Sequence, residues 1–366
     1  MMYDLAVIGS GPGGYVAAIR ASQLGMKVCV IEKENLGGVC LNWGCIPTKS
    51  LLKSAQVFNY AKNAENYGVS ISGEVKPDFG RMTARSREVA AGMSKGVQFL
   101  FKKNSIEVIN GFGRLKSSSL VEVTQEDGNI VEVEAKNIIL ATGARSKELA
   151  GLKQDGKKII GYREAMTLEK QPESMIIVGS GAIGSEFAYF YNTIGTAVTL
   201  VEFLPEIVPN EDEEVSKTLA RAFKKAKMKI MTGSSVESVD TSGDLCKVTI
   251  KTPKGEEQAE AEIVLSAVGV VPNIENIGLE EAGVFVERGK VKVDEYYNTS
   301  VKGIYAIGDI VSGPALAHVA SAEGIICVEK IAGLDVEPLD YNNIPGCTYT
   351  NPEISSVGLT EKKARE

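Results

Sequence analysis

Two cysteines, Cys40 and Cys45, lie in a glycine-rich segment that runs from Gly37 to Lys49 and reads GGVCLNWGCIPTK. Their Cys-x4-Cys spacing is not the Cys-x2-Cys spacing of zinc sites, and no second Cys or His pair follows at metal-ligand distance. The segment follows a glycine-rich turn of the kind that binds dinucleotides, which is described below. A dithiol beside a bound dinucleotide can exchange two electrons with it. The segment therefore predicts a redox relay and no metal site.

The spacing of the two cysteines also constrains the local backbone. On a regular α-helix, residues five apart have Cα atoms roughly 8–9 Å apart, whereas a disulfide tolerates no more than about 7 Å. A bridge therefore requires a distorted first turn, which Gly44 and Pro47 permit. Strained or exposed disulfides tend to be catalytic. The alternative is a pair of buried free thiols in a helix, which gives no packing reason for the neighbouring glycines and Lys49.

The elements around this segment contain one pattern twice. Each copy has an apolar strand, a Gly-x-Gly-x-x-Gly turn, a helix and a second strand that ends in glutamate. The third glycine precedes the glutamate by 18 residues in both copies. The glycines are Gly9, Gly11 and Gly14 in the first copy and Gly179, Gly181 and Gly184 in the second, and the glutamates are Glu32 and Glu202.

This repeated pattern is the βαβ fingerprint of dinucleotide binding. Its glycines allow a tight turn, close approach of a pyrophosphate and close packing of helix on strand, and the phosphate charge meets the free N–H groups of the helix N-terminus. Each glutamate is expected to accept hydrogen bonds from a ribose diol, although a solvated strand end is the alternative. Because an acid repels a 2′-phosphate, Glu202 favours NAD over NADP.

Together with these two patterns, further segments predict an α/β protein with two Rossmann-like dinucleotide-binding domains. Apolar strands are expected over 137–143, 263–269 and 303–309. The last strand ends in Asp309, which suits a hydrogen bond to the ribityl chain of a flavin, with a helix N-cap as the alternative. Alternating apolar and polar residues predict antiparallel ribbons inserted at about 110–136 and 233–260.

Length, charge and cysteine usage exclude several classes of protein. The 366 residues predict two to three domains, and the net charge of −7 argues against nucleic-acid or anionic-membrane binding. A strand pattern begins at Tyr3 in place of a signal peptide, and no apolar run reaches about 18 residues, so we expect a cytoplasmic protein. The other cysteines, which read as reduced core thiols, are Cys29, Cys246, Cys327 and Cys347.

Taken together, these residues resemble the flavoprotein disulfide reductases with two dinucleotide-binding domains, and within them the dihydrolipoamide dehydrogenases. The resemblance covers nearly the whole chain, and the redox segment and the Gly308-Asp309 pair are its most specific motifs. The run from Cys45 to Lys49 and the acidic Glu202 point to the lipoamide enzymes. Glutathione-reducing relatives generally carry basic residues at the second site to hold NADP.

The resemblance implies FAD in the first site and NAD in the second. The residues expected at FAD are Gly9, Gly11, Gly14, Glu32, Lys33, Lys49, Gly113, Ala141, Thr142, Gly143, Asp309, Ala315, Leu316, Ala317 and His318. The residues expected at NAD are Gly179, Gly181, Ile183, Gly184, Glu186, Glu202, Val236 and Gly269.

The same resemblance implies roles for four catalytic residues. Cys40 is expected to exchange with the substrate disulfide, and Cys45 to lie against the flavin as a thiolate. Lys49, four residues after Cys45, lies on the same side of a helix and pairs with Glu186, with a solvated lysine as the alternative. His318 is expected to contribute backbone at a helix start and not to act as the side-chain base.

The resemblance also divides the chain. Residues 1–148 are expected to form the first part of the FAD domain, 149–271 the NAD domain, 272–340 a return segment of the FAD domain, and 341–366 the start of an interface domain. Because family members continue into that interface domain, which carries a His-Glu base and the dimer contacts, we expect a C-terminally truncated chain with impaired turnover.

The predicted function is oxidation of protein-bound dihydrolipoamide through a redox disulfide and FAD, with NAD as acceptor. The expected partners are a lipoyl-bearing protein of a 2-oxo-acid dehydrogenase or glycine cleavage system and, in the longer form, a second copy of the chain as a homodimer. Two alternatives stay open. One is reduction of another disulfide or of mercuric ion, and the other is a cofactor-binding module with diaphorase activity alone.

Overall fold

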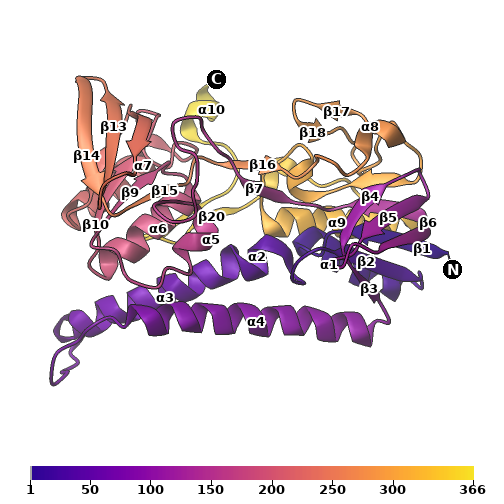
Figure 1. Ribbon diagram of the computed structural model, residues 1–366, viewed down its shortest axis with the longest axis horizontal. Coiled ribbons are helices and arrows are strands. Elements are labelled where there is room, and N and C mark those ends of the chain that lie inside the picture. Colours follow the sequence, from indigo (N-terminus) through magenta and orange to yellow (C-terminus); the bar gives the residue numbers. More distant parts are fainter. Residues whose placement is uncertain (1) are drawn as a thin grey trace. The chain divides into compact units, whose positions relative to one another are not determined.

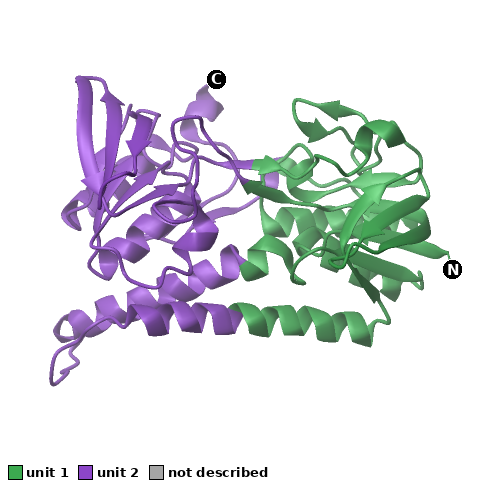
Figure 2. Cartoon of the chain, viewed as in Figure 1, with its two compact units in different colours: residues 1–42, 90–145, 271–341 green, residues 43–89, 146–270, 342–366 purple. Residues whose placement is uncertain are grey.

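The computed structural model describes residues 2–366, which form two compact units, each built from three stretches of chain (Figure 2). Unit 1 comprises residues 1–42, 90–145 and 271–341, and unit 2 comprises residues 43–89, 146–270 and 342–366. Each unit has its own sheet and its own apolar core. Across residues 2–366, no helix combines the length and the apolar composition that crossing a bilayer requires.

Unit 1 is organised around a parallel sheet with the order β3-β2-β1-β6, and β19 pairs with β6 on its other side. The strands are β1 (Tyr3–Ile8), β2 (Val28–Glu32), β3 (Glu107–Asn110), β6 (Ile130–Leu140) and β19 (Ile304–Ala306). The residues of β2 are all buried, because central parallel strands are covered on both faces. The carboxyl ends of these strands are therefore the natural place for a ligand.

The ribbon predicted at about 110–136 is confirmed. Strands β4 (Phe112–Leu115) and β5 (Leu120–Thr124) pair antiparallel, and β5 pairs antiparallel with the first part of β6. The long strand β6 thus belongs to the ribbon at its beginning and to the parallel sheet at its end. Val121 and Val123 point into the core of unit 1 and are fully buried.

Two helices of unit 1 pack closely against each other, α1 (Pro12–Gln23) and α9 (Ala317–Ile331) (Figure 1). A Cβ on Gly324 would lie 2.8 Å from the carbonyl oxygen of Gly13, so a larger residue would separate the two helices. Their close approach fixes the N-terminus of α1 relative to the N-terminus of α9. Both N-termini belong to the predicted flavin site.

Unit 2 repeats the arrangement with a five-stranded parallel sheet in the order β11-β10-β9-β15-β8. Its strands are β8 (Ile159–Ile160), β9 (Ser174–Val178), β10 (Ala197–Val201), β11 (Lys229–Met231) and β15 (Ile263–Ser266), and its helices include α6 (Ala182–Thr193) and α7 (Glu213–Lys225). The second predicted ribbon is also confirmed, because β12 (Ser235–Asp240), β13 (Cys246–Thr252) and β14 (Gly255–Ala261) pair antiparallel.

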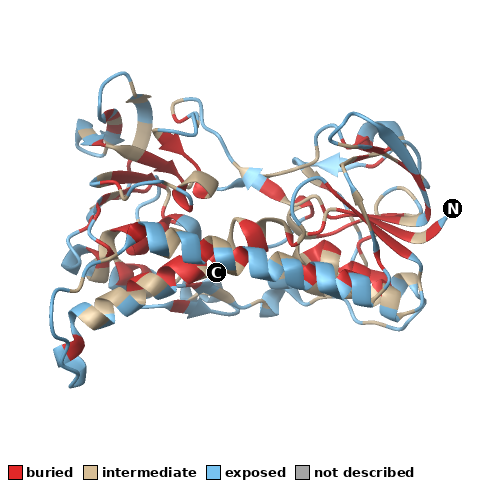
Figure 3. Cartoon of the chain, turned by 60° about the horizontal axis from the view of Figure 1, so that its bottom comes forward, coloured by how far each residue is buried: buried red, intermediate tan, exposed pale blue. Residues whose placement is uncertain are grey.

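The redox segment forms two helices, α2 (Gly38–Asn42) and α3 (Cys45–Lys62). Helix α4 (Phe79–Lys103) begins in unit 2 and ends in unit 1, and its exposed and buried residues alternate along its length (Figure 3). The remaining elements are η1 (Ala64–Tyr67), β7 (Ala144–Ser146), α5 (Tyr162–Ala165), β16 (Val270–Pro272), α8 (Leu279–Ala282), β17 (Val286–Glu287), β18 (Lys290–Val291), η2 (Gly308–Ile310), η3 (Tyr341–Asn343), β20 (Gly346–Thr348), β21 (Ile354–Ser356) and α10 (Glu361–Arg365).

The compact units differ from the sequence-based division in two ranges. Residues 43–89 group with unit 2, because α3 packs against α6. Residues 342–366 also group with unit 2, where β20 packs against α6 and the N–H of Glu361 donates to Asp212 at 2.7 Å. The assignment of FAD, NAD and interface domains to ranges of the chain stays a prediction.

Candidate functional site

The first glycine turn joins β1 to α1 in unit 1. Gly9 has a φ of +102°, which only glycine adopts without strain, and a Cβ on it would lie 2.3 Å from the oxygen of Ala141. A Cβ on Gly14 would lie 1.9 Å from the oxygen of Gly9. Gly11 is the N-cap of α1 and makes no side-chain cap. The first N–H groups of the helix thus remain available to an anion.

The second glycine turn joins β9 to α6 in unit 2 and repeats this geometry. Gly179 has a φ of +96°, and its Cβ would lie 2.4 Å from the oxygen of Ala267. A Cβ on Gly184 would lie 1.9 Å from the oxygen of Gly179, the same distance as in the first turn. Gly181 is the N-cap of α6. The two turns therefore have one design, as their sequences predicted.

A backbone-lined cradle lies at the first turn. A Cβ on Gly38 would lie 2.5 Å from the Cα of Gly11, so Gly38 does not tolerate a side chain at this approach. The free helix N-terminus and this glycine-lined approach fit the pyrophosphate of FAD. At the second turn, a Cβ on Gly181 would meet nothing within 4 Å.

The two glutamates that follow the turns have equivalent hydrogen bonds. Glu32 Oε2 accepts from the N–H and the hydroxyl of Ser10 at 2.9 and 2.6 Å, and Oε1 accepts from the N–H of Glu34 at 2.8 Å. Glu202 Oε2 accepts from the N–H and the hydroxyl of Ser180 at 2.8 and 2.6 Å, and Oε1 accepts from the N–H of Leu204 at 2.8 Å.

These contacts hold both carboxylates beside their turns. Glu32 and Glu202 are 8% and 7% exposed, so neither is the solvated strand end that the sequence left open. A carboxylate oxygen accepts more than one hydrogen bond, and each glutamate retains acceptor capacity for a ribose diol. The serine that orients each glutamate was not predicted, although its place directly after the first glycine is visible in both copies of the repeat.

Cys40 and Cys45 form a disulfide, and the other four cysteines are free. The helix breaks between them: Cys40 lies in α2, Cys45 is the first residue of α3, and Gly44 separates them with φ −142° and ψ −114°. The break removes the long Cα–Cα separation of a continuous helix. The alternative of two free thiols in one helix is therefore wrong for this structure. Both cysteines are half-buried.

The free cysteines correct one expectation. Cys29, Cys246 and Cys327 are buried, and burial raises the pKa of each thiol, to about 12 for Cys29. These three are unreactive core thiols, as predicted. Cys347 is exposed, because it lies on the short β20–β21 hairpin, so its assignment to the core was wrong.

An ion pair joins α3 to α6 within unit 2. The Nζ atom of Lys49 donates to Oε1 and Oε2 of Glu186 at 2.9 and 2.8 Å. The side chain of Glu186 is 4% exposed and that of Lys49 is 36% exposed. Lys49 is therefore not a freely solvated lysine. Its charge compensates a carboxylate that would otherwise be buried alone, which is strongly unfavourable.

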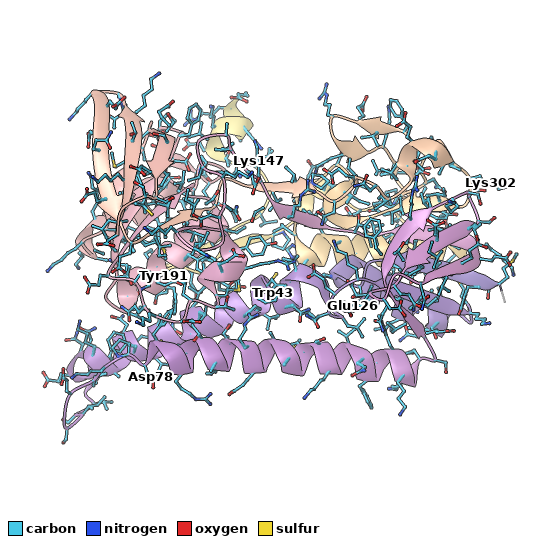
Figure 4. The ribbon with its side chains drawn as sticks, in the orientation of Figure 1. Trp43, Asp78, Glu126, Lys147, Tyr191 and Lys302 are labelled. Atoms are coloured by element: carbon cyan, nitrogen blue, oxygen red, sulfur yellow. The ribbon has the colours of Figure 1, made fainter. Side chains whose placement is uncertain are left out.

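A cationic clamp, formed by Arg87 and Arg163 and not revealed by the sequence, contacts Trp43, the only tryptophan of the chain. Trp43 is labelled in Figure 4. The guanidinium carbons of Arg87 and Arg163 lie 4.7 and 5.3 Å from the centre of its indole ring. Both are within the range of cation–π attraction. Trp43 stands between the two cysteines in sequence, so the clamp fixes the segment where the helix breaks.

The turn at Gly308 and Asp309 is held by a buried carboxyl of unit 1. Glu323 on α9 is 1% exposed, and its Oε2 accepts from the N–H of Gly308 at 2.6 Å while its Oε1 accepts from the hydroxyl of Tyr341 at 2.6 Å. Burial raises the pKa of Glu323 to about 7, and burial also raises the pKa of Asp309. Asp309 lies inside η2, whereas the N-cap of α9 is Leu316, so the N-cap alternative for Asp309 is wrong.

The remaining predicted residues follow the two units. All residues expected at FAD lie in unit 1 except Lys49, and all residues expected at NAD lie in unit 2. Ala141, Thr142 and Gly143 follow the end of β6, and Gly269 follows β15 with a φ of +105°. Gly113 lies in β4, Val236 in β12, Ile183 in α6, and Lys33 directly after β2. The α9 start comprises Ala315, Leu316, Ala317 and the exposed His318.

Within residues 2–366, no three His, Cys, Asp or Glu side chains gather in a way that could hold a metal ion. The chemistry of the described side chains is that of two anion-binding turns, two oriented carboxylates and one disulfide. This combination binds two dinucleotides and exchanges electron pairs with a dithiol.

Comparison with known proteins agrees with this geometry. Residues 3–324 match the family described as pyridine nucleotide-disulphide oxidoreductase. The dihydrolipoyl dehydrogenase of Rhizobium etli is 48% identical over 380 residues, which cover 100% of this chain and 79% of that protein. That of Chlorobaculum parvum is 49% identical over 367 residues, which cover 99% of this chain and 77% of that protein. The crystal structure of LpdA from Mycobacterium tuberculosis matches with a TM-score of 0.91 and 30% identity, covering 98% of this chain and 79% of that one.

Proposed function

The chain belongs to the pyridine nucleotide-disulphide oxidoreductase family, and from this premise we propose that it acts as a dihydrolipoyl dehydrogenase. The reaction oxidises protein-bound dihydrolipoamide to lipoamide and reduces NAD⁺ to NADH with release of a proton. FAD and NAD are its cofactors. Reduction of mercuric ion or of another disulfide is not favoured, because both curated relatives described above are dihydrolipoyl dehydrogenases.

One observation carries this proposal: the Cys40–Cys45 disulfide occurs in the same chain as two equivalent glycine turns, each with its own oriented glutamate. A disulfide alone serves structure as often as chemistry, and a single glycine turn indicates only one nucleotide. Two dinucleotide turns and one dithiol provide a site for each partner in an electron transfer from a dithiol to NAD⁺.

The two turns bind the cofactors through their backbone. The N-termini of α1 and α6 present free N–H groups, and the helix dipole attracts the negative charge of each pyrophosphate. Glu32 would accept a hydrogen bond from the ribose of FAD, and Glu202 would accept one from the ribose of NAD. Asp309 adds a carboxyl to the FAD site, and Glu323 holds its turn by the hydrogen bond to Gly308.

The disulfide receives electrons in a thiol–disulfide exchange. A thiolate of the substrate attacks the sulfur of Cys40, the Cys40–Cys45 bond breaks, and Cys45 leaves as a thiolate. The second substrate thiolate then attacks the mixed disulfide, which releases lipoamide and leaves Cys40 reduced. FAD, when bound, supplies two-electron carrier chemistry between this dithiol and NAD⁺. The disulfide re-forms as NAD⁺ takes up a hydride equivalent and one proton is released.

The ion pair of Lys49 and Glu186 places a compensated charge near this exchange. Lys49 follows Cys45 by four residues in α3, so both side chains leave the same face of the helix. A cation on that face stabilises a thiolate at Cys45. His318 contributes the exposed start of α9, and we assign it no side-chain proton transfer.

The partner follows from the substrate. Dihydrolipoamide is carried on proteins of lipoamide-containing complexes, so the protein works with such a complex. The identity of that complex as a 2-oxo-acid dehydrogenase or glycine cleavage system, the homodimeric state and the cytoplasmic location stay predictions.

Thiol alkylation tests the function without requiring full turnover. The protein reconstituted with FAD is incubated anaerobically with dihydrolipoamide, treated with iodoacetamide and examined by peptide mass spectrometry. Cys347 is the internal standard, because it is exposed and belongs to no disulfide. We expect Cys40 and Cys45 to be labelled only after dihydrolipoamide, and NAD⁺ to prevent this labelling while NADH appears. Cysteines that stay unlabelled after dihydrolipoamide would overturn the proposal.

A further inference from the structure

The ion pair of Lys49 and Glu186 has a third member, Tyr349. The backbone N–H of Tyr349 donates to Oε1 of Glu186 at 3.0 Å, and Nζ of Lys49 lies 4.8 Å from the centre of the Tyr349 ring. Glu186 is 3% exposed and therefore depends on these donors, whereas the side chain of Lys49 is 36% exposed. Tyr349 thus contacts both charges of the pair, one through its backbone and one through its ring.

The backbone of Tyr349 is fixed by its neighbours. It follows β20, which pairs antiparallel with β21 and packs beside α6 (Figure 1). Thr348 and Thr350 on either side are 5% and 4% exposed, and the hydroxyl of Thr350 donates to the oxygen of Pro352 at 2.7 Å. The N–H that reaches Glu186 therefore has a set direction, and the ring of Tyr349, a residue that is 41% exposed, projects from this fixed backbone.

The ring of Tyr349 restricts the position of the Lys49 ammonium in a way that the carboxylate of Glu186 alone does not. A lysine ammonium on a flexible four-carbon stem can reach the carboxylate of Glu186 from several positions. The side chain of Lys49 is 36% exposed, so its surroundings alone do not select one of them. An aromatic face attracts the cation from one side and excludes solvent there. Glu186 and the ring together restrict the ammonium of Lys49, which leaves α3 four residues, or about one turn, after Cys45.

We propose that Tyr349 is a positioning residue that holds the ammonium of Lys49 on the Cys45 face of α3. This role rests on the proposed function, in which the Lys49 charge stabilises the Cys45 thiolate. The ring acts through Lys49 and touches no reacting atom. The segment after residue 341, which groups with unit 2, therefore takes part in the redox site through one residue, Tyr349.

The test measures the reactivity of Cys45 in protein reduced with dithiothreitol, so it needs neither FAD, NAD nor lipoamide. Iodoacetamide alkylation of Cys45 is followed by mass spectrometry from pH 5 to pH 10. In Tyr349→Leu we expect a higher midpoint pH and a rate at pH 7 roughly two-fold to five-fold lower, as expected for loss of one cation–π contact. Tyr349→Phe, which keeps the ring and the backbone N–H, should behave as the unmodified protein.

Two controls separate positioning from general destabilisation. In a Lys49→Met background, adding Tyr349→Leu should change nothing further, because the group through which the ring acts is absent. Tyr296→Leu removes a comparable contact elsewhere, since Nζ of Lys330 lies 4.2 Å from that ring, and should leave Cys45 unchanged.

Three results would overturn the proposal. Cys45 could be alkylated as fast in Tyr349→Leu as in the unmodified protein, or Tyr349→Leu could lower the alkylation rate equally in the Lys49→Met background. The third such result is that Tyr296→Leu lowers the rate as much as Tyr349→Leu does. The failure of the proposed function would look different. If dihydrolipoamide did not reduce the disulfide, the coupling between Tyr349 and Lys49 could still be measured. Conversely, a chain that oxidises dihydrolipoamide could lack this coupling.

Discussion

Single carboxylates have the most specific roles in this molecule. Glu32 and Glu202 hold equivalent positions, and each is oriented by the serine after the first glycine of its turn. Orientation by a buried hydroxyl keeps the carboxylate in place before any ligand arrives, which lowers the entropy cost of binding. We therefore predict that nucleotide choice at the second site depends on one preorganised side chain, Glu202.

Glu202→Ala combined with Phe203→Arg should shift preference from NADH toward NADPH. The first change removes repulsion of a 2′-phosphate, and the second places a guanidinium at a residue that is 73% exposed. The ratio of the dissociation constants of NADH and NADPH, measured by fluorescence titration, should change by roughly a hundredfold, or about 2.7 kcal/mol. Glu202→Ala alone should weaken the binding of NADH without creating tight binding of NADPH. Unmodified protein that already prefers NADPH would contradict the assignment.

Glu323 should make the stability of the protein depend on pH near neutrality. Its pKa is raised by burial from the ordinary value of 4.5 to about 7, so between these values the folded chain binds more protons than the unfolded chain. The free energy of unfolding therefore falls as pH rises through this window and levels off above it. Glu323→Gln still accepts from Gly308 and offers an N–H to Tyr341, but it does not titrate.

Urea unfolding at intervals from pH 5 to pH 8 checks this expectation. Relative to Glu323→Gln, the free energy of unfolding of the unmodified protein should fall by about 1–3 kcal/mol from pH 5 to pH 8. Asp309, whose pKa burial also raises, is present in both proteins, and its negative charge adds to the raised pKa of Glu323. Parallel stability curves would show that Glu323 is ionised in the folded state at all these pH values.

At the scale of elements, each glycine turn sets the distance between a helix and its strand. Gly184→Ala would place a methyl group 1.9 Å from the oxygen of Gly179, so α6 must move away from β9. We expect the free energy of unfolding to fall by about 1–3 kcal/mol and NAD affinity to fall at least roughly tenfold. Thermal melts and NADH titration provide the measurements.

Gly92→Ala is the matched control for this change. Gly92 lies inside α4, where an added Cβ meets nothing within 4 Å, so alanine should stabilise the protein by roughly 0.5–1 kcal/mol. FAD content should stay unchanged in both variants, because the first turn is intact in each. Equal stability of Gly184→Ala and the unmodified protein would mean that α6 tolerates displacement from β9.

At the scale of the whole molecule, the residues predicted for the two cofactor sites fall into different units, except that Lys49 of the predicted FAD site lies in unit 2. The core of unit 1 and the core of unit 2 share no residue, and each unit contains its own turn and glutamate. Ligand binding to one unit therefore stabilises mainly that unit. The Cys40–Cys45 disulfide lies where the chain passes from the first stretch of unit 1 into unit 2.

Hydrogen exchange with each cofactor should show this division. NAD should slow exchange most around residues 179–204, and FAD should slow it most around residues 9–34, because these ranges contain the turns and glutamates. Mass spectrometry of the exchanged peptides reads both regions in one experiment. Strong protection of residues 9–34 by NAD in FAD-saturated protein would contradict separate sites.

The sequence by itself determined the features that depend on near neighbours along the chain. The repeated glycine spacing specified both turns, because positive φ and a missing Cβ are local requirements. The alternating residues specified both antiparallel ribbons. The Cys-x4-Cys spacing required a distorted helix turn, and the structure has a break between two helices at Gly44. The α/β fold class with two dinucleotide-binding domains followed from the same local patterns.

Only the tertiary structure decided which distant residues complete these local designs. Tyr349 meets Glu186 across 163 positions of sequence, and Lys49 meets Glu186 across 137. The arginines that clamp Trp43 and the carboxyl that holds Gly308 likewise come from other elements. Such contacts depend on how helices pack on sheets, and packing leaves no periodic signal at the residues it brings together. A resemblance to known proteins supplied the pairing of Lys49 with Glu186, but the place of Tyr349 beside that pair appears only in the folded chain.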